Sequence, residues 1–464
     1  MGTLGTHRNS LRELAILRDL GDGLILRQAT AADTEALAAF NADVLRDPGD
    51  VEPNEPVAAW TRDTMSGEHP TVQVGDFTVV EDTRNSAIVS SLCLISQTWS
   101  YGGIPFGVGR PEAVATHPAY RRRGLVRAQF EVAHAWSAAR GHKMQAVTGI
   151  PWFYRQFGYE MALTLGGGWR GHTSYIPKLR DGETEPYRVR PAVEADLAFI
   201  AQVYDEAMRR FLVACVRDKR LWQYELNGRS EKNDDRVELR VVEAMDGEQV
   251  GFLAHLPKLW GPHLATTFYE LKPGISWLAV TPSVLRYLQA TGEQYAAQHH
   301  RTFEGVWFLL GTEHPVYQVA RDRLPEVCQP YTWYVRVPDV VGFLRRVAPL
   351  LERRLAESVL AGHTGVLKLN FYRDGLRMIF EHGRLKMVEA WEPAPAREPW
   401  VPAFAGEGTA AQFPGLTFLQ LLFGYRTLEE LDHAFPDCWA ETDEARMLLQ
   451  VLFPKQPSLI WPVV

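Results

Sequence analysis

Hydrophobic and polar positions change their period several times along the chain, and each change marks a predicted element. A short apolar strand ends at Arg27, and an apolar-periodic helix opens after Asp33. An Asp at this place can accept hydrogen bonds from the unpaired amides of a helix start. The pattern returns where a second strand ends at Arg190 and Asp196 opens a helix. This repeat predicts two copies of one α/β unit, beginning near residues 22 and 186.

The order of elements downstream supports the repeat. Residues 115–118 (Ala-Thr-His-Pro) are expected to end a strand before a helix, and residues 279–282 (Ala-Val-Thr-Pro) to do the same in the second copy. The polar stretch 178–186 between the copies is typical of a linker.

A third region begins near Val337 with apolar residues at helical spacing from 341 to 360. The period then changes to two, and turns at 374–375 and 382–383 separate three alternating segments, which predicts a three-stranded meander. Two helices and an extended tail, 457–464, complete the chain. The predicted fold class is therefore α/β and α+β, with domains at 1–180, 186–336 and 337–464.

The segment most typical of a chemical site runs from Val108 to Tyr159. Residues 109–116 are expected to form a strand, 117–124 a loop, and 125–139 a helix that Gly141 caps at its end. Residues 144–147 form a short buried strand in this prediction. The strand–loop–helix order places the loop at a helix N-terminus.

Such a loop suits a pyrophosphate. Unpaired amides and the helix dipole favour an anion there. Gly124 lets the backbone approach closely, and Arg121, Arg122 and Arg123 add positive, fork-shaped donors. The alternative is a solvated arginine run. Three cations at a helix N-terminus oppose the dipole, however, so the sequence favours an anion site.

Composition narrows the function classes. The chain has 49 basic and 56 acidic residues, a net charge of −7, which gives no support for nucleic-acid binding. Its four cysteines are scattered and form no metal-ligand pattern, so we expect neither disulfides nor a metal. No apolar run is long enough for a membrane span, and residues 1–18 do not form a signal peptide. We expect a cytoplasmic protein.

The motif segment resembles the acetyl-CoA-binding segment of the GNAT N-acetyltransferases, whose usual pattern is (Gln/Arg)-x-x-Gly-x-(Gly/Ala). Arg121 and Gly124 fit, whereas Val126 departs from it. Arg-Arg-Arg-Gly-Leu at 121–125 and Phe-Tyr-Arg-Gln-Phe-Gly-Tyr at 153–159 resemble the enhanced-intracellular-survival type of aminoglycoside acetyltransferase. That resemblance covers nearly the whole chain. It implies a catalytic GNAT domain, a degenerate GNAT-like domain, a sterol-carrier-protein-like domain and a homo-oligomer, in that family a hexamer.

The resemblance also implies roles for individual residues. Val464 would be the general base through a terminal carboxylate, although the family ends in an aromatic residue. Asp43 and Trp60 lie where the family builds its acceptor pocket. Tyr154 matches the general acid, whereas its spacing alone, among Phe153, Phe157 and Tyr159, favours a core aromatic. The residues implied to bind acetyl-CoA are Val114, Ala115, Thr116, Arg121, Arg122, Arg123, Gly124, Leu125, Val126, Arg127, Gly149 and Ile150.

The sequence leaves two alternatives for the tail and gives one expectation for the second copy of the repeat. The apolar tail 459–464 is expected either to bring a carboxylate to the first domain's site or to pack on another domain with its carboxylate exposed. The second copy lacks the arginine cluster and the glycine after Thr281-Pro282, so we expect it not to hold acetyl-CoA.

The leading hypothesis is an acetyl-CoA-dependent N-acetyltransferase acting on a primary amine of an aminoglycoside, a polyamine or a lysine side chain. An amine must lose a proton before it attacks a thioester, and the leaving thiolate must gain one, which calls for a base and an acid. Two rivals are a lipid or sterol carrier that works through the third domain, and a non-catalytic acetyl-CoA sensor.

Overall fold

The computed structural model describes residues 16–393 and 409–464, and the chain divides into two compact units. The first unit comprises the residues up to Ile95, Pro111–Trp136 and Lys232–Asp234. The second comprises Ser96–Arg110, Ser137–Glu231 and Asp235–Val464. Mixed sheets with helices occur throughout, which confirms the predicted fold class of α/β and α+β. Most of the N-terminal segment that we expect not to be a signal peptide lies outside the described residues.

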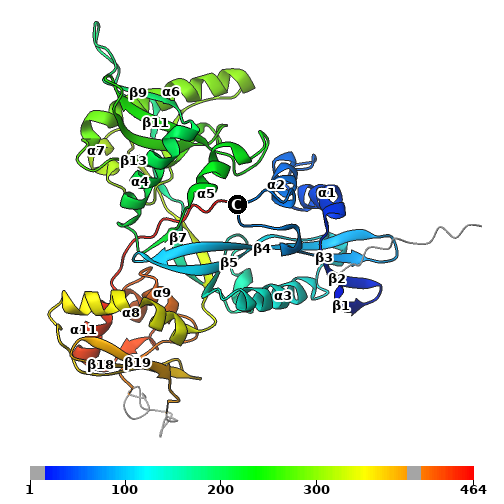
Figure 1. The fold of residues 1–464 in the computed structure, drawn as a ribbon, viewed down its shortest axis with the longest axis vertical. Helices are drawn as coiled ribbons and strands as arrows, with labels where there is room; N and C mark the ends of the chain where they lie inside the picture. Colours follow the sequence, from blue (N-terminus) through cyan, green and yellow to red (C-terminus); the bar gives the residue numbers. More distant parts are fainter. Residues whose placement is uncertain (1–15, 394–408) are drawn as a thin grey trace, which may run out of the picture. The chain divides into compact units, whose positions relative to one another are not determined.

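The first unit is built on antiparallel strands. Strand β2 pairs with β1 and β3, and β3 pairs with the first half of β4. Leu24, Leu26 and Val80 on these strands form a small core with Leu125 and Ala128 of helix α3. Figure 1 shows the strands and helices of this unit in blue and cyan. Their bounds are β1 Ile16–Gly21, β2 Leu24–Gln28, β3 Phe77–Asp82, β4 Ala87–Tyr101, α1 Thr34–Val44, α2 Glu55–Met65 and α3 Leu125–Ala139.

A buried ion network joins strand β2 to the start of helix α1. The Arg27 guanidinium donates to both oxygens of Asp33 at 2.9 Å and to Glu81 at 2.7 Å. Asp33 also accepts the backbone amide of Thr30 at 2.7 Å. Burial by itself would raise the pKa of Asp33, but the bonds from Arg27 and Thr30 hold it below its ordinary value. Asp33 thus does not cap α1 with its side chain; it accepts the upstream Thr30 amide at the start of the short 3₁₀ helix Ala31–Asp33 while it anchors the strand.

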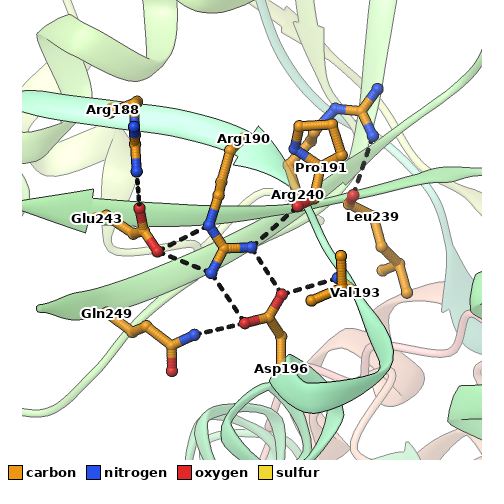
Figure 2. Close-up of polar contacts among 9 residues, drawn as sticks. All are labelled: Arg188, Arg190, Pro191, Val193, Asp196, Leu239, Arg240, Glu243 and Gln249. Carbon is orange, nitrogen blue, oxygen red and sulfur yellow. Dashed lines mark hydrogen bonds and ion pairs between the residues drawn. The ribbon is translucent and has the colours of Figure 1, made fainter. Parts of the chain in front are cut away.

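The repeat predicted from the sequence carries the same network a second time (Figure 2). Arg190, on strand β9 (Tyr187–Pro191), donates to both oxygens of Asp196 and to Glu243, and Asp196 accepts the amide of Val193. Asp196 immediately precedes helix α4 (Leu197–Met208). The shared residue pattern thus encodes one strand–helix junction that is built twice.

The second unit contains a seven-stranded sheet in the order β15-β8-β14-β13-β12-β11-β9. Helix α6 (Trp277–His299) packs on it through Val280, Val284 and Leu288. The remaining strands are β8 Gly168–His172, β11 Glu238–Ala244, β12 Gln249–His255, β13 His263–Leu271, β14 Gly305–Phe308 and β15 Glu326–Cys328. Strands β13 and β14 are parallel, and the other pairs in this sheet are antiparallel.

Helix α6 corrects one expectation. Residues 279–282 do not end a strand, because β13 already ends at Leu271 and α6 begins at Trp277. The Ser276 hydroxyl caps α6 by accepting the Ala279 amide, and Pro282 lies inside the helix. Pro282 is the sixth residue of α6 and removes one helical hydrogen bond, but the buried apolar face of the helix outweighs that loss, so the Thr-Pro pair does not mark a boundary.

Two strands cross between the sheets. Strand β16 (Tyr331–Arg336) follows the seven-stranded sheet in the chain, yet it pairs with β6 (Met144–Val147) on one edge and β7 (Glu160–Leu165) on the other. Conversely, β8 follows β7 in the chain and pairs with β14 and β15. Strand β16 therefore belongs to the sheet of β6 and β7, whereas β8 belongs to the seven-stranded sheet.

The third sheet has the order β19-β18-β17-β20-β21. Strands β17 (Gly365–Asn370), β18 (Gly375–Glu381) and β19 (Arg384–Ala390) form the predicted meander. The other elements are β20 Ala411–Gln412, β21 Trp439–Ala440, α8 Val340–Ala356, α9 Phe418–Leu422, α10 Leu428–Ala434 and α11 Asp443–Leu452. Residues 394–408, which follow the meander in the chain, lie outside the described residues.

A shared core joins this sheet to the second-unit part of β4. Trp99 packs edge-on against Trp333 at 5.7 Å between ring centres, and Tyr101 packs against Phe343 of α8 at 5.6 Å. The Tyr101 hydroxyl also donates to the Leu422 carbonyl at 2.5 Å. Apolar residues of β16, α8, the meander and α11 therefore belong to one continuous core.

We expect Gly171→Ala, in β8, to destabilise the second unit by about 1–3 kcal/mol or more. A Cβ at this position would lie 1.8 Å from the backbone oxygen of Arg323, so backbone must move to admit it. Urea denaturation measures the loss. Gly75→Ala is the control, because its Cβ would meet only the flexible Gln28 side chain, at 3.4 Å. Equal stability of the two variants would contradict this packing.

Candidate functional site

The end of strand β5 (Ile104–Thr116) is bent by a residue in the left-handed region. Ala113 has φ +50°, a conformation that non-glycine residues rarely adopt. The Ser91 hydroxyl donates to its carbonyl oxygen at 3.1 Å and holds the bend. Of the next residues, Ala115 is buried, whereas Val114 and Thr116 are half-buried. The segment Val114–Thr116, predicted to bind the cofactor, therefore follows directly on a bend.

A buried polar network joins this strand end to helix α3. The Ser90 hydroxyl donates to the Ala115 carbonyl at 2.7 Å, and the side chains of Ser90 and Gln129 lie 2.7 Å apart. The Gln129 amide in turn donates to the carbonyl oxygen of Thr78, on β3, at 3.2 Å. These contacts fix the first turns of α3 relative to the end of β5.

The predicted arginine loop lies between those two elements. Arg122 has φ +64° and Gly124 has φ +76°, so two left-handed residues turn the chain into the helix. The side chains of Arg121, Arg122 and Arg123 are exposed. The Arg121 side chain donates to the Thr116 carbonyl at 3.3 Å, and the Arg123 guanidinium lies 5.0 Å from the Tyr120 ring centre. A Cβ built on Gly124 meets nothing within 4 Å, so the backbone is open to a ligand there.

Tyr120 links this loop to strand β3. Its hydroxyl donates to Asp82 at 2.8 Å, and Asp82 also pairs with Arg84. The bonds from Arg84 and Tyr120 hold the pKa of Asp82 well below its ordinary value. The bond to Asp82 in turn raises the pKa of Tyr120, so this tyrosine is a hydrogen-bond anchor.

The remaining predicted cofactor residues follow in α3. Helix α3 begins at Leu125, whose side chain is buried in the first unit's core. Val126 is half-buried and Arg127 is exposed. The loop and the first turn of α3 thus combine exposed arginines with a helix start, the arrangement that binds a phosphate.

In the second unit, the loop after β6 holds two left-handed residues, Gly149 at φ +118° and Trp152 at φ +67°. Two tyrosines of β16 hold this loop. The Tyr331 hydroxyl donates to the Gly149 carbonyl at 2.9 Å, and the Trp152 amide donates to the Tyr334 hydroxyl. The side chains of Ile150 and Trp152 remain exposed. The loop is therefore fixed by its backbone and presents apolar side chains outward.

Tyr154 follows in a short 3₁₀ helix, Phe153–Phe157. It is 4% exposed and packs edge-on against Tyr334 at 5.5 Å and Tyr159 at 6.4 Å between ring centres. A Cβ on Gly149 would lie 3.6 Å from the Tyr154 hydroxyl, which places that hydroxyl beside the loop backbone. The two predicted roles, core aromatic and proton donor, are both compatible with this position.

The acid nearest to Tyr154 in sequence is already paired. Glu160 forms an ion pair with Arg155 at 2.7 Å. The hydrogen bond to Glu160 is the main cause of the raised pKa of Arg155. Glu160 is therefore engaged with Arg155, on the same side of the loop as Tyr154 in the chain order.

Val464 lies in the second unit and is 8% exposed. Its backbone oxygen accepts from Arg229 at 3.3 Å, and the Val463 oxygen accepts from Gln97 of β4 at 2.8 Å. The oxygen of residue 464 is thus held by an arginine. One alternative drawn from the sequence places an exposed carboxylate at this residue, whereas Val464 is buried.

The two predicted acceptor-site residues belong to the first unit. Asp43 is half-exposed and lies 3.5 Å from Arg46 on the next turn of its helix. Trp60 is 5% exposed and packs edge-on against Phe77 at 6.2 Å between ring centres. Trp60 is therefore a core residue of this unit, and Asp43 a surface residue with an ion-pair partner.

Sequence reasoning missed the supporting residues. Ser90, Gln129, Tyr331 and Tyr334 hold the strand end and the loop, but none belongs to a local motif. The aromatic-rich run 331–336 is typical of a strand, so the element could have been found, though not its partners.

Membrane-spanning helices and metal-binding clusters were sought among the described residues, 16–393 and 409–464. These residues contain no helix with the length and apolar character needed to cross a membrane. They also bring together no group of three His, Cys, Asp or Glu side chains suited to a metal ion.

The family comparison decides the class of the N-terminal fold. Residues 26–162 match the acetyltransferase (GNAT) domain model. The chain carries a GNAT acetyltransferase domain. The match confirms the prediction of an N-acetyltransferase at this level. It spans the bent strand end, the arginine loop and Tyr154, whereas a search of curated proteins gives no match.

Solved structures resemble the chain over nearly its full length. A conserved protein of Enterococcus faecalis, a probable N-acyltransferase, has a TM-score of 0.65 and 13% identity, covering 95% of this chain and 99% of its own. A GCN5-related N-acetyltransferase from Anabaena variabilis has a TM-score of 0.62 and 14% identity, covering 94% and 99%. Eis1 from Mycobacterium abscessus has a TM-score of 0.58 and 13% identity, covering 95% and 99%. At these identities the likeness is one of fold.

We expect Tyr334→Phe to loosen the loop 149–152, because it removes the hydroxyl that accepts the Trp152 amide but keeps the ring against Tyr154. Hydrogen exchange of the loop amides should accelerate, and stability should fall by about 1 kcal/mol. Tyr372→Phe is the control, since it removes a hydroxyl bond to Asp437 in the third-sheet region. Unchanged exchange in Tyr334→Phe would contradict the bracing role.

Proposed function

We propose that the chain transfers an acetyl group from acetyl-CoA to a primary amine. The observation that carries this proposal is the exposed arginine loop at the start of α3, within the matched acetyltransferase domain. Gly124, with its open Cβ side, would admit the pyrophosphate to the loop backbone, and Arg121, Arg122 and Arg123 would supply positive charge. Val114–Thr116 would contact the pantetheine arm as a neighbouring strand does.

In this proposal, acetyl-CoA supplies a thioester whose carbonyl carbon the amine attacks. A carbon–nitrogen bond forms, the carbon–sulfur bond breaks, and Tyr154 donates a proton to the leaving thiolate. The amine gives up its extra proton to a base, and the carboxylate proposed at Val464 is the candidate. Arg229 donates to the Val464 oxygen and would hold that carboxylate in place.

The domain plan and the acceptor complete the proposal. The seven-stranded sheet would be a degenerate acetyltransferase-like domain and the third sheet, with its helices, a sterol-carrier-protein-like domain. The acceptor would be an aminoglycoside, a polyamine or a lysine side chain, and the enzyme a homo-oligomer. The repeated Arg–Asp network supports the tandem plan, since the same junction is built in both sheets.

Acetyl-CoA binding tests the cofactor site. Titration calorimetry should give one site per chain, and Gly124→Asp should abolish it by adding a side chain and a negative charge beside the phosphates. Gly182→Asp is the control, because its Cβ position is open and its φ of +84° is equally left-handed. Two sites of similar affinity would contradict the degenerate second domain.

Turnover tests the chemistry. We expect thiol release from acetyl-CoA with a panel of primary amines, and a fall in kcat of about 10²–10⁴-fold in Tyr154→Phe. Acetyl-CoA affinity should stay unchanged in that variant. Binding without turnover against every amine would favour the sensor hypothesis, and a co-purified lipid would favour the carrier.

The base has its own test. Glycines appended after Val464 would move the carboxylate while leaving the apolar tail in place, so kcat should fall while acetyl-CoA affinity is kept. Wild-type turnover of the extended chain, with Tyr154→Phe still inactive, would transfer the base role to water or to another acid such as Asp43.

A further inference from the structure

The last residues of the chain lie along the second domain in an extended course. The Leu212 amide donates to the Pro457 carbonyl at 2.8 Å, and the Leu459 amide donates to the Val213 carbonyl at 3.1 Å. The Leu459 side chain is buried in a core with Phe268 of β13. Both backbone and side chain therefore fix the entry of this tail.

The tail then reaches the end of the parallel pair β13–β14. The Leu309 amide donates to the Thr266 carbonyl at 2.8 Å and continues the pairing by one residue. The Leu309 carbonyl oxygen accepts from the Trp461 indole at 3.1 Å. The carboxyl ends of parallel strands are where α/β sheets commonly place ligands. In this domain, the Trp461 indole of the tail contacts the carboxyl end of the β13–β14 pair.

A cluster of three buried charged residues lies beside the tail from Trp461 onward. We call Arg217, Glu225 and Arg229 the tail clamp. Glu225 lies in a single turn of π-helix, Tyr224–Gly228, after helix α5 (Lys219–Gln223). Its carboxylate pairs with Arg217 at 3.0 Å and with Arg229 at 2.7 Å. All three side chains are less than 5% exposed, so their geometry is set by the protein.

Each arginine of the clamp has a second partner in the tail. Arg217 donates to the Trp461 carbonyl at 2.5 Å. Arg229 donates through Nε and Nη2 to the oxygen of Val464, both at 3.3 Å. Glu225 therefore orients two guanidinium groups, and each grips a different backbone oxygen of the tail.

Aromatic rings enclose the first of these arginines. The Arg217 guanidinium lies 4.8 Å from the ring centres of Trp222 and Phe268 and 5.5 Å from that of Tyr204. Burial alone would raise the pKa of Glu225, but the charges of Arg229 and Arg217 keep it below its ordinary value. The clamp is therefore a charged and desolvated receptor with one fixed geometry.

The held tail also contacts the strand β4. The Gln97 side chain donates to the Val463 carbonyl at 2.8 Å, and its own oxygen accepts from the Trp99 indole at 3.0 Å. Residues 461, 463 and 464 thus each have a backbone oxygen bonded to a side chain that is itself held by a partner.

We propose that the second domain serves as a receptor for the chain's last residues, in which the tail clamp positions residue 464 for acetyl transfer. This inference rests on the proposed function, because it gives residue 464 a place in the reaction. Arg217, Glu225 and Arg229 are positioning residues that act through the tail and touch no substrate.

The first test measures the tail without any reaction. Hydrogen exchange of residues 459–464 should be slow in the full-length protein and at least 10-fold faster in Arg229→Gln. Arg220→Gln is the matched control, because it removes an exposed arginine from neighbouring α5 and should leave the tail protected. Fast exchange in the wild type, or equal exchange in both variants, overturns the clamp.

The second test asks whether the clamp acts through the tail. Arg229→Gln should lower kcat at least 10-fold while the KM for acetyl-CoA stays unchanged, and Arg229→Lys should recover part of that loss. In a chain lacking residues 461–464, Arg229→Gln should cause no further loss. An additive loss, or a changed acetyl-CoA KM, overturns the positioning role.

Two outcomes separate the proposals. A wild type with a protected tail but no turnover on any amine contradicts the proposed function and leaves the receptor standing. Should Arg229→Gln fail to fold, Trp461→Phe tests the same idea from the tail's side, because it removes the indole bond to Leu309 and leaves the clamp's charges in place. An unchanged tail and unchanged kcat in Trp461→Phe would then overturn it.

Discussion

The pairing of strand β16 with β6 and β7 is the constraint on which the second unit depends. One face of β16 brings Trp333 into the core that also holds the meander and helix α8. Its Tyr331 and Tyr334 side chains fix the loop that leads to Tyr154. A strand that arrives after the seven-stranded sheet therefore completes the neighbourhood of the candidate proton donor, and the two regions cannot fold as independent pieces without leaving strand edges unpaired.

The two strand–helix junctions share one network, but the segments that follow them differ. Both have the Arg–Asp–Glu network at the strand–helix junction, with a buried guanidinium at Arg27 and a half-buried one at Arg190. Only the first copy has the arginine loop before its long helix, whereas α6 of the second copy begins with a Ser276 cap and no arginine cluster. Anchoring is thus common to both copies, and the candidate chemistry belongs to one.

Local periodicity predicts the elements that a short, continuous stretch of sequence defines. The meander and helix α3 follow from alternation, helical spacing and glycine caps, and the repeat correctly predicts the Asp33 and Asp196 junctions. The partners of β16 and the seat of the tail could not be predicted, because pairing between distant segments leaves no period in either one. Pro282 misled for the opposite reason, since a local breaker signal lost to a capped helix with a buried apolar face.

The buried charges at the tail are explained better by geometry than by stability. Withdrawing Arg217, Glu225 and Arg229 from water is costly, and apolar residues of similar volume often stabilise a fold as much or more. Apolar packing of Leu459 already attaches the tail, so attachment alone does not require charges. What a guanidinium adds is direction, because its fixed fork of donors defines where an acceptor oxygen must lie. Two such forks, oriented by a single carboxylate, determine the positions of two tail oxygens, which is more than packing alone would achieve.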